Sequence, residues 1–285
     1  MRKISKPAIL PQDVFDACVD SIHDGNLQSK FKKIANNFAA AAADYDNLAT
    51  GANLYQIAAY VGNNTSVVIG GVTKDELKKL YSQQMVGENK PARKIYETLR
   101  ALSLGMLCPL CGFGQVKTLD HYLPKGKFPL YSVMPSNLVP ACRDCNTGKL
   151  TKTGASAEEQ TIHPYFDKKH YFEDQWLFAE VKQTSPATVI FFSDPPKSWD
   201  LVSMLRVKTH IKNYDLSSRF RIQVADHLSS LRYELNYLSD AKSRSEHLLQ
   251  RATSSKQVHV NSWQTALHQA LYKNAWYCQS GFTLS

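Results

Sequence analysis

The sequence lacks any apolar run long enough to cross a membrane, and its first residues lack the hydrophobic core of a secretion signal. The basic start, MRKISKPAILPQD, holds only a short apolar run from Ala8 to Leu10, which Pro11 ends. Glycine and proline are not enriched, so neither a fibrous repeat nor a disordered chain is indicated. These absences predict a soluble, cytoplasmic protein with no membrane partner.

An acidic balance is also lacking, because 34 Lys and Arg face 25 Asp and Glu, for a net charge of +9. Such a chain attracts polyanions and can bind phosphates by counterion release, although many basic proteins bind no nucleic acid. Hydrophobic residues make up 43% of the chain, enough for one large core or two modest ones.

Cysteines are few, but four of the six stand in two Cys-x-x-Cys pairs: Cys108, Cys111, Cys142 and Cys145. Four soft ligands at this spacing predict a closed tetrahedral structural Zn²⁺ site, since thiols stay reduced in the cytoplasm. The rival interpretation is an oxidoreductase built on the same pairs, although a redox motif needs one pair only. Cys18 and Cys278 are expected to be structural.

The segment between the pairs carries Asp120-His121 directly after Val116–Leu119, which alternates like a strand. On the other side, Pro140 predicts the start of a helix. Four residues of that helix would share one face: Cys142, Cys145, Asn146 and Lys149. Zinc would then fasten strand to helix and bring Asn146 towards Asp120 and His121.

These residues suit phosphodiester hydrolysis, which needs a water nucleophile, a base and a cation. His121 is the candidate base, because an imidazole titrates near working pH. Asp120 and Asn146 offer oxygen ligands to a catalytic Mg²⁺, or to Mn²⁺ or Ni²⁺ in its place. Four basic side chains are expected to contact substrate phosphates: Lys125, Lys127, Arg143 and Lys149.

Residues Cys108 to about Lys149 resemble the HNH, or ββα-metal, endonucleases in the zinc-containing form that has four cysteine ligands. The resemblance makes His121 the general base and Asp120 and Asn146 the ligands of the catalytic metal, while Asn137 braces the loop. It implies cleavage of DNA by default, or of RNA such as tRNA. It covers about a seventh of the chain, and a motif needs geometry to support it.

A looser resemblance extends through Ile162–Asp167, whose His-Pro-Tyr stretch is similar to HNH subunits of Septu-like and retron-linked anti-phage systems. It implies a nuclease effector held in check by an ABC-type ATPase and, if retron-linked, associated with a reverse transcriptase and its nucleic acid. His163 itself is more simply a turn residue with a satisfied ring.

The expected fold is α+β and mainly helical, with three regions. Residues 1–105 form a helical region in which Thr73 and Glu76 make a capping box, and residues 106–172 form the zinc-stapled ββα-metal module. Residues 173–285 hold a β-hairpin, Trp176–Val181 with Thr188–Phe192, and helices for assembly or partner binding. A leucine-rich stripe there indicates a bundle seam or a partner-binding helix: Val224, Leu228, Leu231, Leu235 and Leu238.

A function from another class stays open. The same cysteines would also fold a non-catalytic zinc module that binds nucleic acid or a partner protein. Asp120, His121 and Asn146 together argue against it, because a binding module needs neither a base nor hard-metal ligands beside its zinc.

Overall fold

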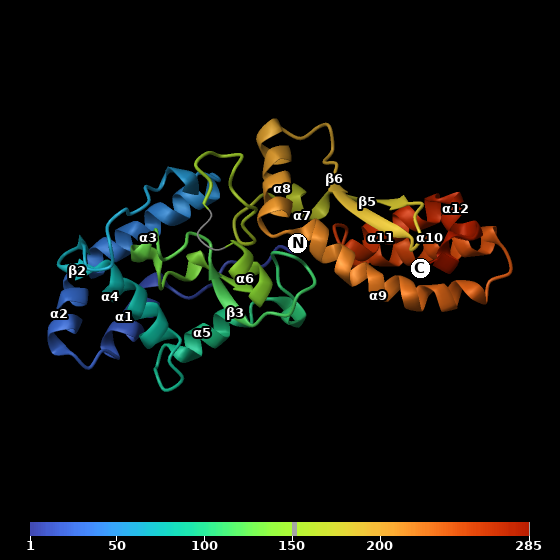
Figure 1. The fold of residues 1–285 in the computed structure, drawn as a ribbon. Coiled ribbons are helices and arrows are strands. Elements are labelled where there is room, and N and C mark those ends of the chain that lie inside the picture. Colours follow the sequence, from blue (N-terminus) through green and yellow to red (C-terminus); the bar gives the residue numbers. More distant parts are fainter. Residues whose placement is uncertain (150–152, 285) are drawn as a thin grey trace. The chain divides into compact units, whose positions relative to one another are not determined.

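The computed structural model describes residues 1–149 and 153–284 (Figure 1). The fold is α+β and mainly helical, as predicted, with three separate two-stranded sheets in the described ranges. The chain divides into two compact units, Arg2–Asp167 and Lys168–Ser285, and Met1 belongs with the second. The boundary expected near residue 105 falls inside the first of these units. No helix in the described part of the chain is both long and apolar enough to span a bilayer.

The first unit begins with three helices, α1 (Pro11–Asp20), α2 (Gly25–Lys33) and α3 (Ala35–Thr50), followed by the short η1 (Leu54–Gln56). Phe15 of α1 stacks on Phe38 of α3 with ring centroids 4.6 Å apart, and Phe31 of α2 meets it edge-on at 6.3 Å. Apolar residues recur with a helical period from Phe31 to Tyr45, a pattern that by itself favours one continuous helix. The helix is instead broken at Ile34, so that α2 and α3 pack around the same buried rings.

The next segment leads towards the cysteines. Strands β1 (Val67–Ile69) and β2 (Val72–Thr73) pair, and α4 (Lys74–Lys79) follows with the predicted capping box, in which Glu76 accepts from the Thr73 amide at 2.7 Å. The helix continues as a π-helical turn, η2 (Leu80–Met85), and then α5 (Arg93–Arg100) and η3 (Leu104–Met106) follow. Because π-helical turns are rare and often occur at functional sites, η2 is a candidate part of a functional site.

Strand β3 (Thr118–His121) pairs antiparallel with β4 (Leu138–Ala141), and α6 (Arg143–Lys149) begins shortly after β4. Two short turns lie between the strands, η4 (Pro129–Tyr131) and η5 (Pro135–Asn137). The prediction that Pro140 starts the helix is wrong, since it lies in β4 opposite Leu119. In a two-stranded sheet both strands are edges, where a residue without an N–H is tolerated.

The second unit holds α7 (His170–Glu173), the hairpin β5 (Leu177–Lys182) and β6 (Thr188–Ser193), and α8 (Leu201–Asn213). It continues with α9 (Leu216–Asn236), α10 (Ala241–Val258), α11 (Trp263–Lys273), α12 (Ala275–Gln279) and η6 (Gly281–Leu284). The hairpin prediction is confirmed, with Phe178 opposite Phe192.

Helix α9 carries the predicted leucine-rich stripe. Four of its members are buried, Val224, Leu228, Leu231 and Leu235, which fits internal packing within the unit. Helix α10 has no counterpart among the predicted elements because only Leu248 and Ala252 are buried along its 18 residues, too few to give a periodic apolar pattern.

Candidate functional site

The four paired cysteines meet in one buried cluster. Their sulfur atoms all lie within 4.8 Å of one another, and the Sγ atoms of Cys111 and Cys142 are 3.9 Å apart. This separation is too long for a disulfide and close to the roughly 3.8 Å expected between two ligands of a tetrahedral zinc ion with Zn–S bonds of about 2.3 Å. The cluster is therefore suited to a structural metal such as zinc.

Two backbone amides support the cluster. The amide of Gly114 donates to Cys111 Sγ at 3.3 Å, and the amide of Cys145 donates to Cys142 Sγ at 3.4 Å. Such donors stabilise thiolates, the form that binds a metal. A glycine is also needed at position 114 for a steric reason, because a Cβ atom there would lie 2.8 Å from Cys142 Sγ. Gly114 was not among the predicted site residues, although the pattern Cys-Gly-Phe-Gly that begins at Cys111 was a signal for it.

The thiols influence one another's acidity. Hydrogen bonds from the other three cysteines hold the pKa of Cys111 far below its usual range, and those from Cys108 and Cys145 help to lower the pKa of Cys142 to about 7. Burial raises the pKa of Cys108, and the neighbouring sulfurs raise that of Cys145. Two of the four thiols therefore lose their protons more readily than a free cysteine does. A divalent cation that binds the cluster can displace the protons of the other two.

His121 lies at the carboxyl end of β3, as predicted, and its ring is fixed by the backbone. Its Nε2–H donates to the Ser132 carbonyl at 2.8 Å, which leaves Nδ1 as the unprotonated ring nitrogen. Burial, with the positive charge of Lys125, lowers the pKa of His121 to about 3 against the opposing bond to Ser132. The imidazole is therefore neutral at physiological pH, with Nδ1 unprotonated, and burial makes it a weaker base than the ordinary imidazole expected from the sequence.

Asp120 precedes it and is 5% exposed. Burial raises the pKa of its carboxyl to about 6, although the Lys149 ammonium, 3.5 Å from Asp120 Oδ2, acts in the opposite direction. Lys149 also donates to the carbonyls of His121, at 3.2 Å, and of Tyr122. A lysine that is 3% exposed and so engaged points away from solvent, which argues against the predicted contact with substrate phosphates. Lys149 instead ties the end of α6 to the end of β3.

Asn146, one turn before Lys149 on α6, completes the set. It lines a cavity of about 510 Å³ together with Asp120 and His121, so the structure brings the three predicted catalytic residues to one space. Lys125 lines it too, whereas Lys127 and Arg143 do not. Five further lining residues come from α4, η2, α5 and the turn between them, and none of them was predicted to belong to the site: Lys78, Tyr81, Ser82, Val86 and Tyr96.

Asn137 is fully buried and makes the contacts expected of a loop brace. Its side-chain oxygen accepts from the Leu123 amide at 2.7 Å, and its amide group donates to the carbonyls of Leu123 and Tyr131, both at 3.1 Å. Tyr45 of α3 adds a hydroxyl that donates to Asn137 Oδ1 at 3.1 Å. The loop between β3 and β4 is thereby held to α3 as well as to itself.

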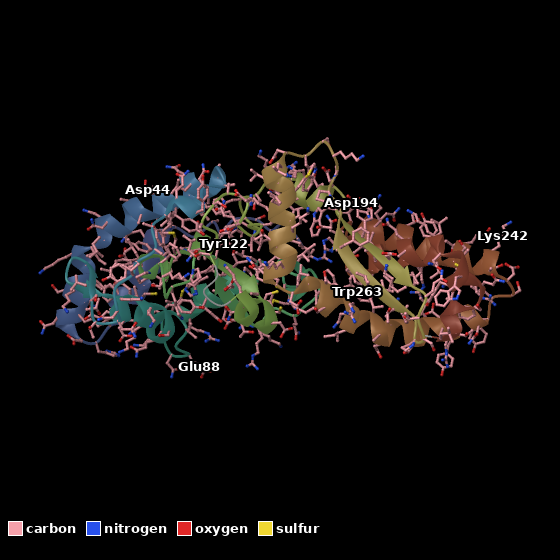
Figure 2. The ribbon with its side chains drawn as sticks, turned by 45° about the horizontal axis from the view of Figure 1, so that its top comes forward. Asp44, Glu88, Tyr122, Asp194, Lys242 and Trp263 are labelled. Carbon is pink, nitrogen blue, oxygen red and sulfur yellow. The ribbon has the colours of Figure 1, made fainter. Side chains whose placement is uncertain are left out.

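His163 is 2% exposed and hydrogen-bonded, with its Nε2 3.3 Å from the Tyr45 hydroxyl and its Nδ1 accepting from the Tyr165 amide. Its ring stacks on the ring of Tyr122 with centroids 4.2 Å apart. Figure 2 labels Tyr122 within the first unit. These contacts fit the structural interpretation of His163. Tyr122 is buried beside it and donates to the Thr161 carbonyl at 2.6 Å, which leaves its ring unavailable for stacking on a base.

Comparison with known proteins gives a relative. Protein ea31 of Escherichia phage lambda is 34% identical over 234 residues, which cover 81% of this chain and 79% of that protein. The chain belongs to the ea31 family. No protein-family model matches it, and no solved structure matches it either. The HNH resemblance stays a prediction from the sequence.

Proposed function

We propose that this ea31-family chain is a metal-dependent endonuclease of the HNH type that hydrolyses phosphodiester bonds of DNA or RNA. The observation that carries the proposal is that Asp120, His121 and Asn146 line one cavity although they come from a strand and a helix. The cysteine cluster joins the same two parts of the unit, since Cys108 and Cys111 precede β3 and Cys145 lies on α6. A zinc ion bound there would hold the three side chains together.

The proposed chemistry uses His121 as general base. Its Nδ1 takes a proton from a water molecule, whose oxygen bonds to phosphorus while the bond from phosphorus to the leaving oxygen breaks and that oxygen is protonated from solvent. The backbone bond from Nε2 to Ser132 holds the ring in the required tautomer. A divalent cation held by Asp120 and Asn146 would supply positive charge beside the phosphate.

A role in anti-phage defence would follow from the resemblance of Ile162–Asp167 to HNH subunits of Septu-like and retron-linked systems. That stretch is largely buried within its own unit, with His163 2% and Tyr165 6% exposed, so its side chains serve packing. An ATPase partner would therefore bind elsewhere on the chain. Whether an ABC-type ATPase co-purifies with this chain tests the anti-phage role separately from the nuclease.

The test of the nuclease is a comparison of the purified parent with His121→Ala, using duplex DNA, single-stranded DNA and RNA, each with Mg²⁺, Mn²⁺ or Ni²⁺. We expect the variant to lose at least about 100-fold in cleavage rate, the usual contribution of a general base. His23→Ala, at an exposed histidine in the α1–α2 loop, is the matched control and should cleave as the parent does.

Two results would count against the proposal. Equal cleavage by His121→Ala and the parent would remove His121 from the mechanism. Absence of cleavage by the parent with every metal and substrate, in protein that carries zinc, would favour the non-catalytic zinc module.

A further inference from the structure

One wall of the cavity comes from outside the HNH-like segment. Lys78 lies on α4, Tyr81 and Ser82 on the π-helical turn η2, and Tyr96 on α5. In η2 the Val86 amide donates to the Tyr81 carbonyl, five residues back, at 3.0 Å. This wall is built on a distorted helix, a feature that often accompanies a binding function.

Tyr81 connects this wall to the proposed base. Its ring meets the His121 ring edge-on at 4.4 Å, and the Lys125 ammonium lies 4.4 Å from the centre of the Tyr81 ring. Lys125 and His121 therefore contact the same aromatic ring. A phosphate held by Lys125 would lie near the bond that His121 is proposed to attack.

Lys125 and Lys78 make no ion pair among the described residues. The neighbouring Lys79 pairs with Asp75 at 2.7 Å, and this bond, helped by the charge of Lys78, lowers the pKa of the carboxyl. Lys78 Nζ donates to the neutral side chain of Asn64 at 3.2 Å, which orients the ammonium without neutralising it. Both lysines line the same cavity, and burial, with the positive charge of Lys78, lowers the pKa of Lys125, so the two ammonium groups repel each other. An anion between them would relieve that repulsion.

We propose that Lys78 and Lys125 together bind a backbone phosphate of the nucleic-acid substrate next to the one that is cleaved. The inference rests on the proposed function and adds a contact from α4 that lies outside the HNH-like segment. Ammonium groups bind phosphate without reading bases, so this pair fixes the position of the strand and leaves sequence selection to other parts. The substrate would then run across α4 as it enters the cavity.

The experiment measures binding separately from cleavage. Lys78→Gln, Lys125→Gln and the double variant are made in the His121→Ala background, and affinity for a labelled duplex and for single-stranded RNA is measured from low to moderate salt. We expect each substitution to weaken binding and to reduce the slope of log affinity against log salt by roughly 0.9 on duplex and 0.7 on single strands. Lys33→Gln, an exposed lysine on α2 with the same charge change, is the control.

The reduction in slope should be about twice as large in the double variant as in either single variant. The double variant should also keep the melting temperature of the His121→Ala protein. Salt slopes that match those of the Lys33→Gln control would overturn the inference, as would a complete failure of His121→Ala protein to bind nucleic acid. Failure of the proposed function gives a different result, because binding is measured without divalent metal, so that cleavage surviving His121→Ala in Mg²⁺ does not consume the probe and the salt slopes can still be read.

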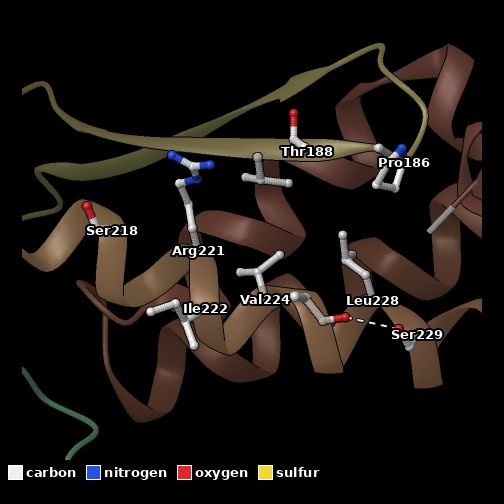
Figure 3. Close-up of a pocket in the computed structure, with 11 residues that line it drawn as sticks. Pro186, Thr188, Ser218, Arg221, Ile222, Val224, Leu228 and Ser229 are labelled. Atoms are coloured by element: carbon white, nitrogen blue, oxygen red, sulfur yellow. Dashed lines mark hydrogen bonds between the residues drawn. The ribbon is translucent and has the colours of Figure 1, made fainter.

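A second hollow, of about 600 Å³, lies between β6 and α9 in the second unit (Figure 3). Its lining is mainly apolar, with Arg221 at the side, and nothing in the structure shows what covers it.

Discussion

Replacing Gly114 by alanine tests how closely the cysteine cluster is built. The added Cβ would lie 2.8 Å from Cys142 Sγ, 2.9 Å from Cys142 Cβ and 3.3 Å from Cys111 Sγ. Contacts below 3.0 Å force a shift, and the neighbours here are short side chains that a bound metal would hold in place. Overpacking of this kind typically costs about 1–3 kcal/mol.

Because about 1.4 kcal/mol corresponds to a factor of ten, zinc affinity of Gly114→Ala should fall roughly 5- to 150-fold if the strain acts on the metal-bound form. The assay is competition for zinc with a coloured chelator, together with thermal unfolding of the zinc-bound protein. In a unit of this size the melting temperature should fall by roughly 2–4 °C for each kcal/mol lost.

Gly25→Ala is the matched control, because a Cβ atom there meets nothing within 4 Å. It should retain the zinc affinity and melting temperature of the parent. If Gly114→Ala held zinc as tightly as Gly25→Ala does, the close approach of Gly114 to the sulfurs would be wrong, and with it the compact four-sulfur site.

Three further results are expected. Stripping zinc with a strong chelator should increase amide hydrogen exchange around the cysteine pairs and the β3–β4 sheet and leave the Lys168–Ser285 unit protected, whereas unchanged exchange at the cysteines would remove the structural role of zinc. Asn137→Ala should destabilise the first unit by at least about 1–3 kcal/mol in urea unfolding, since the buried Leu123 amide loses its acceptor, and an unchanged midpoint would contradict its bracing role. Acid should destabilise the second unit. Burial lowers the pKa of His268 in the folded protein to about 3, whereas a histidine of the unfolded chain titrates near 6.5. Between about pH 6.5 and 3 the unfolded chain therefore binds more protons than the folded one, and stability falls as the pH falls. Unfolding in urea at about pH 7 and about pH 5, on either side of the unfolded pKa, checks this, and His268→Phe should show the weaker pH dependence.

Local patterns predicted the elements whose stabilising contacts are close in sequence. The capping box at Thr73 and Glu76 depends on residues three apart, and the β5–β6 hairpin on two alternating runs joined by a short turn. The same is true of the end of β3, where Asp120 and His121 lie as expected. Helix α10 was missed because a helix with so few buried side chains has little apolar periodicity.

The cavity could be predicted only in part. The sequence motif named Asp120, His121 and Asn146, but Lys78 and Tyr81 come from a helix about 40 residues before β3, and no spacing rule relates them to that strand. In the sequence, every lysine near the motif carries the same positive charge. Whether its ammonium lines the cavity or pairs with a buried carboxylate depends on which segments pack against it, and this distinguishes Lys125 from Lys149.

The sequence by itself determined the chemistry available to this protein: four thiols with metal-ligand spacing, and a carboxylate, an imidazole and an amide between or beside them. These are properties of residue type and short-range spacing, so they survive without knowledge of the fold. Only the tertiary structure decided how these groups are used. Residues from α4, η2 and β3 line one cavity, and burial keeps the His121 imidazole neutral and turns Lys149 inward, because desolvation depends on neighbours that are distant in the chain.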